Sequence, residues 1–255
     1  MKTAAAIAAA AATIGIAIML APSAAGAAEI KVMASNGLKA VLEMVAPLYE
    51  RASEHKLKAT YGTAVPLKRQ IDGGEPFDVV ILTPSLVQDL AKEGKVASGS
   101  IAAVAKTGVG VAIRAGAPKP DISTVDAFKR ALINAKSIIY SKEGQSGAHM
   151  AALIERLGLA EQLKPKIILE TRGGRSIYEV ADGNAEIGFS LISEVLAVPG
   201  AALAGPLPAD IQSYVVLTAG IAASTKDPAA ARGFIDFLKS PAAVPSLKQM
   251  GMEPG

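Results

Sequence analysis

The chain has 255 residues, of which 26 are Lys or Arg and 23 are Asp or Glu, and it contains no cysteine, no tryptophan and 4% aromatic residues. The absence of cysteine excludes disulfides, thiol catalysis, iron–sulfur clusters and thiolate zinc sites. The net charge of +3, with no basic run longer than a pair, gives no indication of nucleic-acid binding, and the scarcity of aromatic side chains argues against a sugar-stacking site.

Residues 1–27 have the parts of a cleavable export signal. Lys2 gives a positive start, Ala4–Leu20 is almost entirely small or apolar, and Ala25-Gly26-Ala27 has the small-x-small form of a cleavage site. A membrane anchor is the alternative, because the apolar stretch approaches spanning length, but Pro22 and the cleavage site favour removal. We therefore expect a soluble periplasmic chain of 228 residues that begins at Ala28 and has a net charge of +2.

The rest of the chain alternates short apolar runs with segments whose apolar residues recur every three or four positions. This alternation is typical of an α/β protein. The expected strands are 30–34, 57–61, 79–82, 109–114, 137–140, 167–170, 186–190 and 212–222. The expected helices are 38–53, 65–71, 84–93, 125–135, 147–157, 176–182, 228–238 and 241–250.

Two irregular stretches indicate crossings between two lobes. Ala115–Pro120 breaks the pattern after the strand at 109–114, and Val198–Pro208 is rich in proline, glycine and alanine. These crossings predict lobe I from residues 28–114 and 213–255 and lobe II from residues 115–212. A ligand is expected in the cleft between the lobes.

The first strand-to-helix corner is Ser35-Asn36-Gly37. A helix N-terminus offers free backbone N–H groups and the positive end of the helix dipole, and the side chains of Ser35 and Asn36 add further polar groups. This corner is therefore a candidate anion site. An ordinary helix cap is the alternative, because serine and asparagine are favoured at that position.

Three segments together carry a family resemblance. They are Val32–Asn36, Tyr61–Leu82 with its Gly-Thr-x-x-x-Leu-x-Arg-Gln-Ile-x-x-Gly stretch, and Ala185–Ser190. They resemble the periplasmic binding proteins of ABC importers, in particular the branch of molybdate-binding proteins. The resemblance implies a type II periplasmic-binding-protein fold: two lobes, each a mixed sheet flanked by helices, with two hinge crossings. It also implies that the lobes close on a small anion and deliver it to a membrane permease.

The resemblance implies that neutral hydroxyls and helix-terminal N–H groups hold the anion. The family has a serine about where Asn36 stands, so the ligand group at the first corner is either Ser35 or the Asn36 amide. Thr63 is the one hydroxyl left where the family has a run of serines, and Thr83, after the strand at 79–82, faces the same cleft in this topology. Helix capping would explain both threonines equally well.

Lobe II contributes two further corners. Ser146 and Gly147 open the helix at 147–157, where glycine allows the backbone to approach a ligand closely. In the last corner, Gly174 lies between Arg172 and Arg175. The family makes a backbone contact near Gly174, and the arginines would suit an oxyanion or a carboxylate, unless this corner is a plain turn with solvated arginines.

One departure from the family pattern concerns the ligand. The tyrosine that closes over molybdate in many members would fall near Leu191, where this chain has no phenol, so Ser190 or Phe189 would line the site instead. The expected ligand is therefore a molybdate- or tungstate-like oxyanion or a small organic acid, and an arginine in the site would suit the organic acid.

No catalytic signature accompanies these corners: the chain has no Gly-x-Ser-x-Gly elbow, no Walker loop and no His-Glu-x-x-His. We expect a monomeric binding protein that is not an enzyme and uses no metal or other cofactor, with a small anion and an ABC permease as partners and no nucleic acid. The alternative is a ligand-sensing periplasmic protein that docks to a membrane signalling receptor, because the same cleft would serve both.

Overall fold

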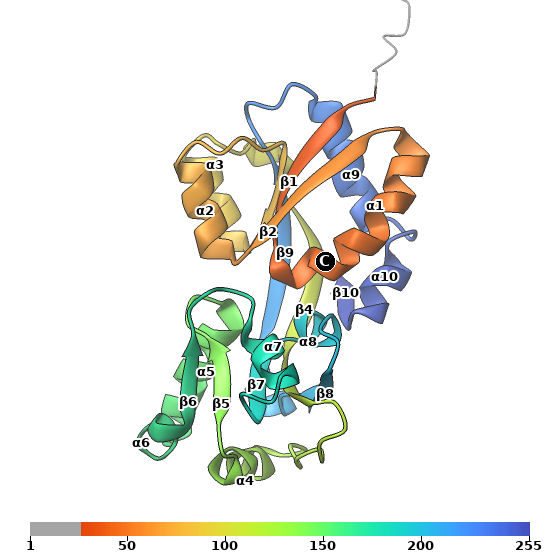
Figure 1. Ribbon diagram of the computed structural model, residues 1–255. Helices are drawn as coiled ribbons and strands as arrows, with labels where there is room; N and C mark the ends of the chain where they lie inside the picture. Colours follow the sequence, from red (N-terminus) through yellow and green to blue (C-terminus); the bar gives the residue numbers. More distant parts are fainter. Residues whose placement is uncertain (1–26) are drawn as a thin grey trace, which may run out of the picture.

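The computed structural model describes residues 27–255, so the expected export signal lies, apart from Ala27, outside the described residues. Strands and helices alternate along the chain (Figure 1). The strands are β1 Glu29–Ser35, β2 Lys56–Gly62, β3 Val79–Leu82, β4 Ala102–Arg114, β5 Ile138–Ser141, β6 Ile167–Glu170, β7 Ile187–Leu191, β8 Ala201–Pro206, β9 Tyr214–Ile221 and β10 Met252–Pro254. The α-helices are α1 Lys39–Ser53, α2 Ala64–Asp72, α3 Pro84–Lys92, α4 Val125–Asn134, α5 Gln145–Arg156, α6 Ala160–Leu163, α7 Ser176–Ala181, α8 Ile192–Leu196, α9 Pro228–Lys239 and α10 Val244–Gln249.

The strands form one continuous hydrogen-bonded path in the order β2-β1-β3-β9-β4-β7-β5-β6, with β8 and β10 also paired to β4. Pairing is parallel within β2-β1-β3 and within β7-β5-β6, and antiparallel where β9 and β4 join these groups. Figure 1 shows the consequence: an upper body with β1, β2, α1–α3, α9 and α10, a lower body with β5–β8 and α4–α8, and β4 and β9 running between them.

Strand β4 belongs to both bodies. Its residues Ala102–Gly108 pair with β9, whereas Val109–Arg114 pair with β7 and β8. We therefore place the first crossing at Gly108–Val109, inside a strand and several residues before the boundary at 114 that the sequence predicts. The irregular stretch 115–120 lies beyond the far end of β4.

The return crossing lies at Gln212-Ser213, just before β9. The Gln212 side chain accepts from the Val109 N–H at 3.0 Å and donates to the Val109 carbonyl at 3.1 Å, so it ties the two crossings together. The division into residues 28–114 with 213–255 and residues 115–212 stays a prediction. Below, lobe I denotes residues 28–108 and 213–255, which pair through β9, and lobe II denotes the residues between them.

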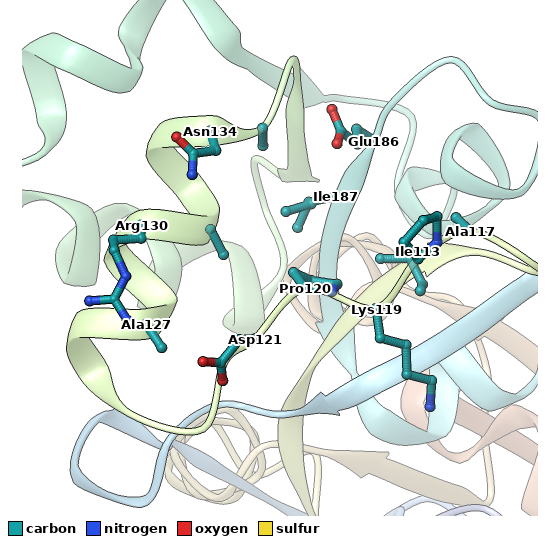
Figure 2. A pocket seen from close by; sticks show the side chains of 13 residues that line it. Ile113, Ala117, Lys119, Pro120, Asp121, Ala127, Arg130, Asn134, Glu186 and Ile187 are labelled. Atoms are coloured by element: carbon teal, nitrogen blue, oxygen red, sulfur yellow. The ribbon is translucent and has the colours of Figure 1, made fainter.

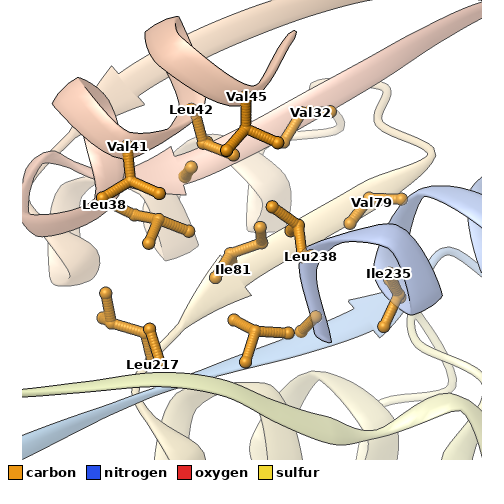
Figure 3. Close-up of a cluster of buried hydrophobic side chains, with 14 of the residues drawn as sticks. Val32, Leu38, Val41, Leu42, Val45, Val79, Ile81, Leu217, Ile235 and Leu238 are labelled. Carbon is orange, nitrogen blue, oxygen red and sulfur yellow. The ribbon is translucent and has the colours of Figure 1, made fainter. Parts of the chain in front are cut away.

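Each lobe buries its own core. In lobe I, α1 turns its apolar stripe of Val41, Leu42, Val45 and Tyr49 toward the sheet, where it meets side chains of β1, β3, β9 and α9 (Figure 3). In lobe II the rings of Phe128 and Phe189 pack edge to face with centroids 5.9 Å apart. Burial of each such side chain stabilises the fold by roughly 1.5–3 kcal/mol. In residues 27–255 no helix is long and apolar enough to span a bilayer.

Candidate functional site

Both lobes contribute to a small cavity, here termed the inner cavity, of about 50 Å³. This space is more than one water molecule needs, so it can hold a small polar group. The polar residues that line it lie at the carboxyl ends of strands or the starts of helices. They are Ser35, Thr63 and Thr83 from lobe I and Ser141, Glu143, Gln145, Ser146, Ser176, Ser190 and Glu194 from lobe II.

The structure brings together most of the residues that the sequence singles out. Those in the inner cavity are Ser35, Thr63, Thr83, Ser146, Gly174 and Ser190. Asn36 and Arg175 line an adjoining hollow of about 690 Å³, here termed the outer hollow. The two spaces share Gly174, Ser176, Ser190 and Glu194. A ligand larger than an oxyanion could therefore extend from one space into the other.

Two hydroxyls of the inner cavity are buried without a partner. Within residues 27–255, Thr83 Oγ1 and Ser141 Oγ make no hydrogen bond, although these residues are only 3% and 7% exposed. Leaving a buried hydroxyl unpaired costs about 1–3 kcal/mol, so each of these groups has a donor and an acceptor available for a bound ligand or an ordered water. Thr83 directly follows β3 in lobe I and Ser141 is the last residue of β5 in lobe II, so the two hydroxyls approach the cavity from opposite lobes.

Helix caps distinguish the cleft from the rest of the molecule. Thr124 and Asp227, which lie away from the inner cavity, accept from backbone N–H groups at the starts of α4 and α9, at 3.1 and 2.9 Å. Thr63 and Thr83 occupy the same position before α2 and α3 but make no such bond. The hydroxyls of Thr63 and Thr83 therefore do not cap these helices, and both remain available for other hydrogen bonds.

The start of α5 is packed against the end of β5. A Cβ at Gly147 would lie 1.7 Å from the carbonyl oxygen of Ser141, so only glycine fits there. Gly147 does not line the cavity itself. It allows α5 to begin close enough to β5 for Ser141 and Ser146 to face the same space.

The last corner is arranged around the buried carboxylate of Glu170. That carboxylate accepts from the backbone N–H of Arg172 and, at 3.4 Å, from that of Arg175. Gly173 and Gly174 have φ of 71° and 78°, a left-handed conformation that glycine adopts readily. The N–H groups of Arg172 and Arg175 are therefore taken by a carboxylate of the chain itself, while Gly174 is left facing the cavity.

The two arginines of this corner point to different places. Arg175 lies over the Tyr178 ring, 5.4 Å from its centroid, and lines the outer hollow. The Arg172 guanidinium pairs with Glu179 and lines a separate hollow with Ile168 and Asn184, here termed the lateral hollow. The structure thus brings Arg175 but not Arg172 to the cleft.

Several residues that line the inner cavity are not among the predicted ligand-binding residues, and three of them, Ser141, Leu191 and Glu194, bear on its chemistry. Ser141 is the last residue of the buried strand β5, and Thr83 directly follows β3, so both stand at the carboxyl end of a strand. Leu191, 6% exposed, forms an apolar wall where a tyrosine was expected, and Phe189 is fully buried in the core, so Ser190 lines the site in its place.

Glu194 is the third of these residues, in the short helix α8. It accepts a hydrogen bond from the Ser190 hydroxyl and lines both the inner cavity and the outer hollow. Desolvation raises the pKa of its carboxyl from the ordinary glutamate value, because the surroundings disfavour the charged form, and the hydrogen bond from Ser190 acts in the opposite direction. The side chain is half-buried, so solvent reaches part of it.

The lobes touch around the inner cavity. Ser193 Oγ donates to the Gly37 carbonyl at 2.7 Å in a buried contact, and Arg69 pairs with Glu143 at 3.2 Å near the surface. The first of these contacts joins α8 to the turn before α1, and the second joins α2 to the loop before α5. These two contacts join the lobes on either side of the inner cavity.

A larger hollow of about 440 Å³ lies in lobe II, between α4 and the loop after β4 (Figure 2). Its charged side chains have mixed sign, with Lys119 and Arg130 against Asp121 and Glu186. It contains none of the residues singled out by the sequence, and we do not assign the ligand to it. In residues 27–255 no three His, Asp or Glu side chains gather as they would around a metal ion.

Comparisons with known proteins agree with this architecture. Residues 30–253 match the model of a family described as bacterial extracellular solute-binding protein. The chain is 32% identical to an aconitate isomerase from Pseudomonas sp, over 88% of this chain and 87% of that protein. It is 29% identical to the molybdate-binding protein ModA of Azotobacter vinelandii, over 89% and 91% of the two chains.

Among solved structures, the periplasmic molybdate-binding protein of Azotobacter vinelandii superposes with a TM-score of 0.75 at 23% identity, covering 88% of this chain and 98% of that one. These matches confirm both the resemblance expected from the sequence and the type II two-lobed fold.

Proposed function

Because the chain belongs to the family of bacterial extracellular solute-binding proteins, we propose that it captures a small anion between its lobes and delivers it to the permease of an ABC importer. The observation that carries this proposal is the pair of buried, unpartnered hydroxyls, Thr83 and Ser141, which face one cavity from opposite lobes. An anion in that cavity would accept from both, so it would be bound more tightly by the closed form than by an open one.

The cavity suits an anion without a countercharge inside it. The helices α2, α3 and α5 all begin at the inner cavity, so their free N–H groups and dipoles favour negative charge there. Hydroxyls from Ser35, Thr63 and Ser146 add further donors. Fixed dipoles of this kind stabilise a desolvated anion with little reorganisation of the site.

We infer that the ligand is a small organic acid with more than one carboxylate rather than a bare oxyanion. The inner cavity can hold a small polar group such as one carboxylate, and the outer hollow that continues from it contains Arg175 and Lys39. A guanidinium can bind a second carboxylate in bidentate fashion. The apolar Leu191 in place of a phenol removes one donor from the oxyanion site, and one relative is named for aconitate, a tricarboxylate.

The protein would act in the periplasm as a monomer, with the membrane permease as its partner. Docking to a membrane signalling receptor remains the alternative, since the same closed and loaded form would be recognised. Deletion of the transporter genes would abolish uptake in the first case and leave it unchanged in the second.

The ligand class is tested by thermal shift of residues 28–255 with molybdate, sulfate, citrate, cis-aconitate and trans-aconitate. We expect a tricarboxylate to raise the melting temperature most and Arg175→Ala to weaken its binding at least tenfold. Arg172→Ala is the matched control, because Arg172 lines the lateral hollow, and it should change the affinity little. Stabilisation by molybdate alone would contradict the organic-acid ligand, and no stabilisation by any anion would contradict the proposed binding function.

A second candidate function is isomerisation of an unsaturated tricarboxylic acid. The match to the Pseudomonas aconitate isomerase favours it, and so does Glu194, a carboxyl group beside the cavity that could exchange a proton with a bound acid. A general acid or base works best when its pKa lies closer to neutrality than that of a free glutamate. Desolvation shifts the pKa of Glu194 upward, in this direction. Proton NMR of cis-aconitate incubated with the protein decides the matter: appearance of the trans isomer would establish an enzyme, and unchanged spectra would exclude this reaction.

A further inference from the structure

An acidic side chain lies in a cleft otherwise suited to anions. Glu194 lines the inner cavity together with the unpartnered hydroxyls of Thr83 and Ser141, and it also lines the outer hollow. In residues 27–255 no Lys, Arg or His nitrogen lies within 4 Å of its carboxylate. A bound anion would therefore face a carboxyl group that no basic side chain neutralises.

We propose that Glu194 contacts the bound anion in its neutral, protonated form, so that the site takes up one proton with each anion it binds. This inference rests on the proposed anion-binding function and makes Glu194 a residue that determines what the site accepts. An ionised Glu194 would repel the ligand in a desolvated space, whereas the neutral acid has an O–H that donates to it.

The hydrogen bond that Glu194 makes within the protein leaves the O–H of its protonated carboxyl free to donate to a ligand. Ser190 donates its hydroxyl proton to one carboxyl oxygen, so that contact uses an acceptor and no donor of the acid. This contact holds the carboxyl at the edge of the cavity, where its own proton can point to the ligand. By itself the Ser190 hydroxyl favours the ionised carboxylate, so the neutral acid depends on desolvation and on the bound anion.

The charged groups around Glu194 come from several elements. Glu143, in the loop before α5, shares the inner cavity with it, while Lys39 and Glu43 of α1 and Arg175 and Tyr178 at α7 share the outer hollow. Two of these groups are basic and two are acidic, so the surroundings bring no large excess of either sign to offset the burial of Glu194.

Proton uptake follows from linkage between the two binding events. Well below the pKa of Glu194 in the free protein the proton is already present and none is taken up. Above that pKa each binding event requires a proton from solvent, so the apparent Kd rises toward tenfold per pH unit. A glutamine at this position carries a permanent N–H donor and removes the dependence.

The test is isothermal titration calorimetry of residues 28–255 between pH 5 and 9, in pairs of buffers that differ in ionisation enthalpy. The probe is whichever of molybdate, citrate, cis-aconitate and trans-aconitate gives the largest thermal shift. We expect wild-type protein to take up close to one more proton per ligand at high pH than Glu194→Gln, and this difference removes the ionisation of the probe itself. Glu161→Gln, at an exposed position of α6 outside both the inner cavity and the outer hollow, is the control and should keep the uptake.

The possible results distinguish a failure of the Glu194 inference from a failure of the proposed anion-binding function. Binding with equal proton uptake in wild type and Glu194→Gln would overturn the role of Glu194 and leave anion binding intact. Binding by none of the probes would overturn both. If Glu194→Gln fails to fold, the same titration with Glu194→Ala decides: loss of the proton uptake supports the inference, and uptake equal to that of the wild type overturns it.

Discussion

Thr83 and Ser141 show how single side chains connect the fold to its ligand. Each stands at the carboxyl end of a buried strand, and each leaves a hydroxyl unpaired in the same cavity. A residue kept for stability would form a hydrogen bond, as Ser100 does by donating to the Ala97 carbonyl at 2.6 Å and accepting from Ile221 N–H at 2.8 Å. The two kinds of buried hydroxyl therefore predict opposite effects of mutation.

Thr83→Val and Ser141→Ala should leave the unfolding free energy of the ligand-free protein unchanged or slightly higher, because no hydrogen bond is lost. Each should weaken anion binding about tenfold, the equivalent of one hydrogen bond to a charged group. Ser100→Ala, the control, should lower the unfolding free energy by about 1–3 kcal/mol and leave the affinity unchanged. Urea unfolding and calorimetric titration measure the two effects, and a loss of stability without a loss of affinity in Thr83→Val would contradict a ligand role.

Parts of the site that lie next to long, regular strands and helices can be predicted from the sequence, whereas parts on short elements cannot. The alternation of strands and helices is encoded locally in apolar spacing, so the corners at Ser35, Thr63, Ser146 and Gly174 follow from it. Strand β8 was missed because its Ala-Ala-Leu-Ala-Gly-Pro sequence has little strand propensity and is held by pairing with β4. Glu194 was missed for a related reason: it belongs to α8, a helix of five residues that carries too little periodic signal to predict.

The close contact of α5 with β5 predicts that position 147 accepts only glycine. Gly147→Ala places a methyl group where the Ser141 carbonyl already lies, so α5 must shift away from β5. We expect the unfolding free energy to fall by about 3 kcal/mol and anion binding to weaken, because Ser141 and Ser146 no longer face one cavity. Gly99→Ala, where a Cβ has nothing within 4 Å, is the control and should change neither quantity in the same assays. Unaltered binding in Gly147→Ala would show that this helix start does not form the site.

At the scale of the whole molecule, the proposed anion capture makes ligand affinity depend on the balance between open and closed lobes. The lobes are joined by a buried bond between Ser193 and the Gly37 carbonyl and an exposed ion pair between Arg69 and Glu143, whose side chains are 63% and 44% exposed. Solvent screens the ion pair, so it contributes at most about 1 kcal/mol, whereas the buried bond has no competing water.

Ser193→Ala should therefore weaken anion binding more than Arg69→Gln does, by about fivefold against less than threefold. The control is Lys92→Gln, which removes an exposed ion pair within α3 and should have no effect. Titration calorimetry measures the affinities, and small-angle scattering should show a larger radius of gyration for ligand-free Ser193→Ala. A larger effect from Arg69→Gln would mean that surface charge controls closure.

The most direct test of anion capture between the lobes is a crystal structure of residues 28–255 with the anion that stabilises them most. The account predicts the anion in the inner cavity, accepting hydrogen bonds from Thr83 Oγ1 in lobe I and Ser141 Oγ in lobe II at once. An anion found in the lobe II hollow near Arg130, or one held by a single lobe with these two hydroxyls still unpaired, would contradict it.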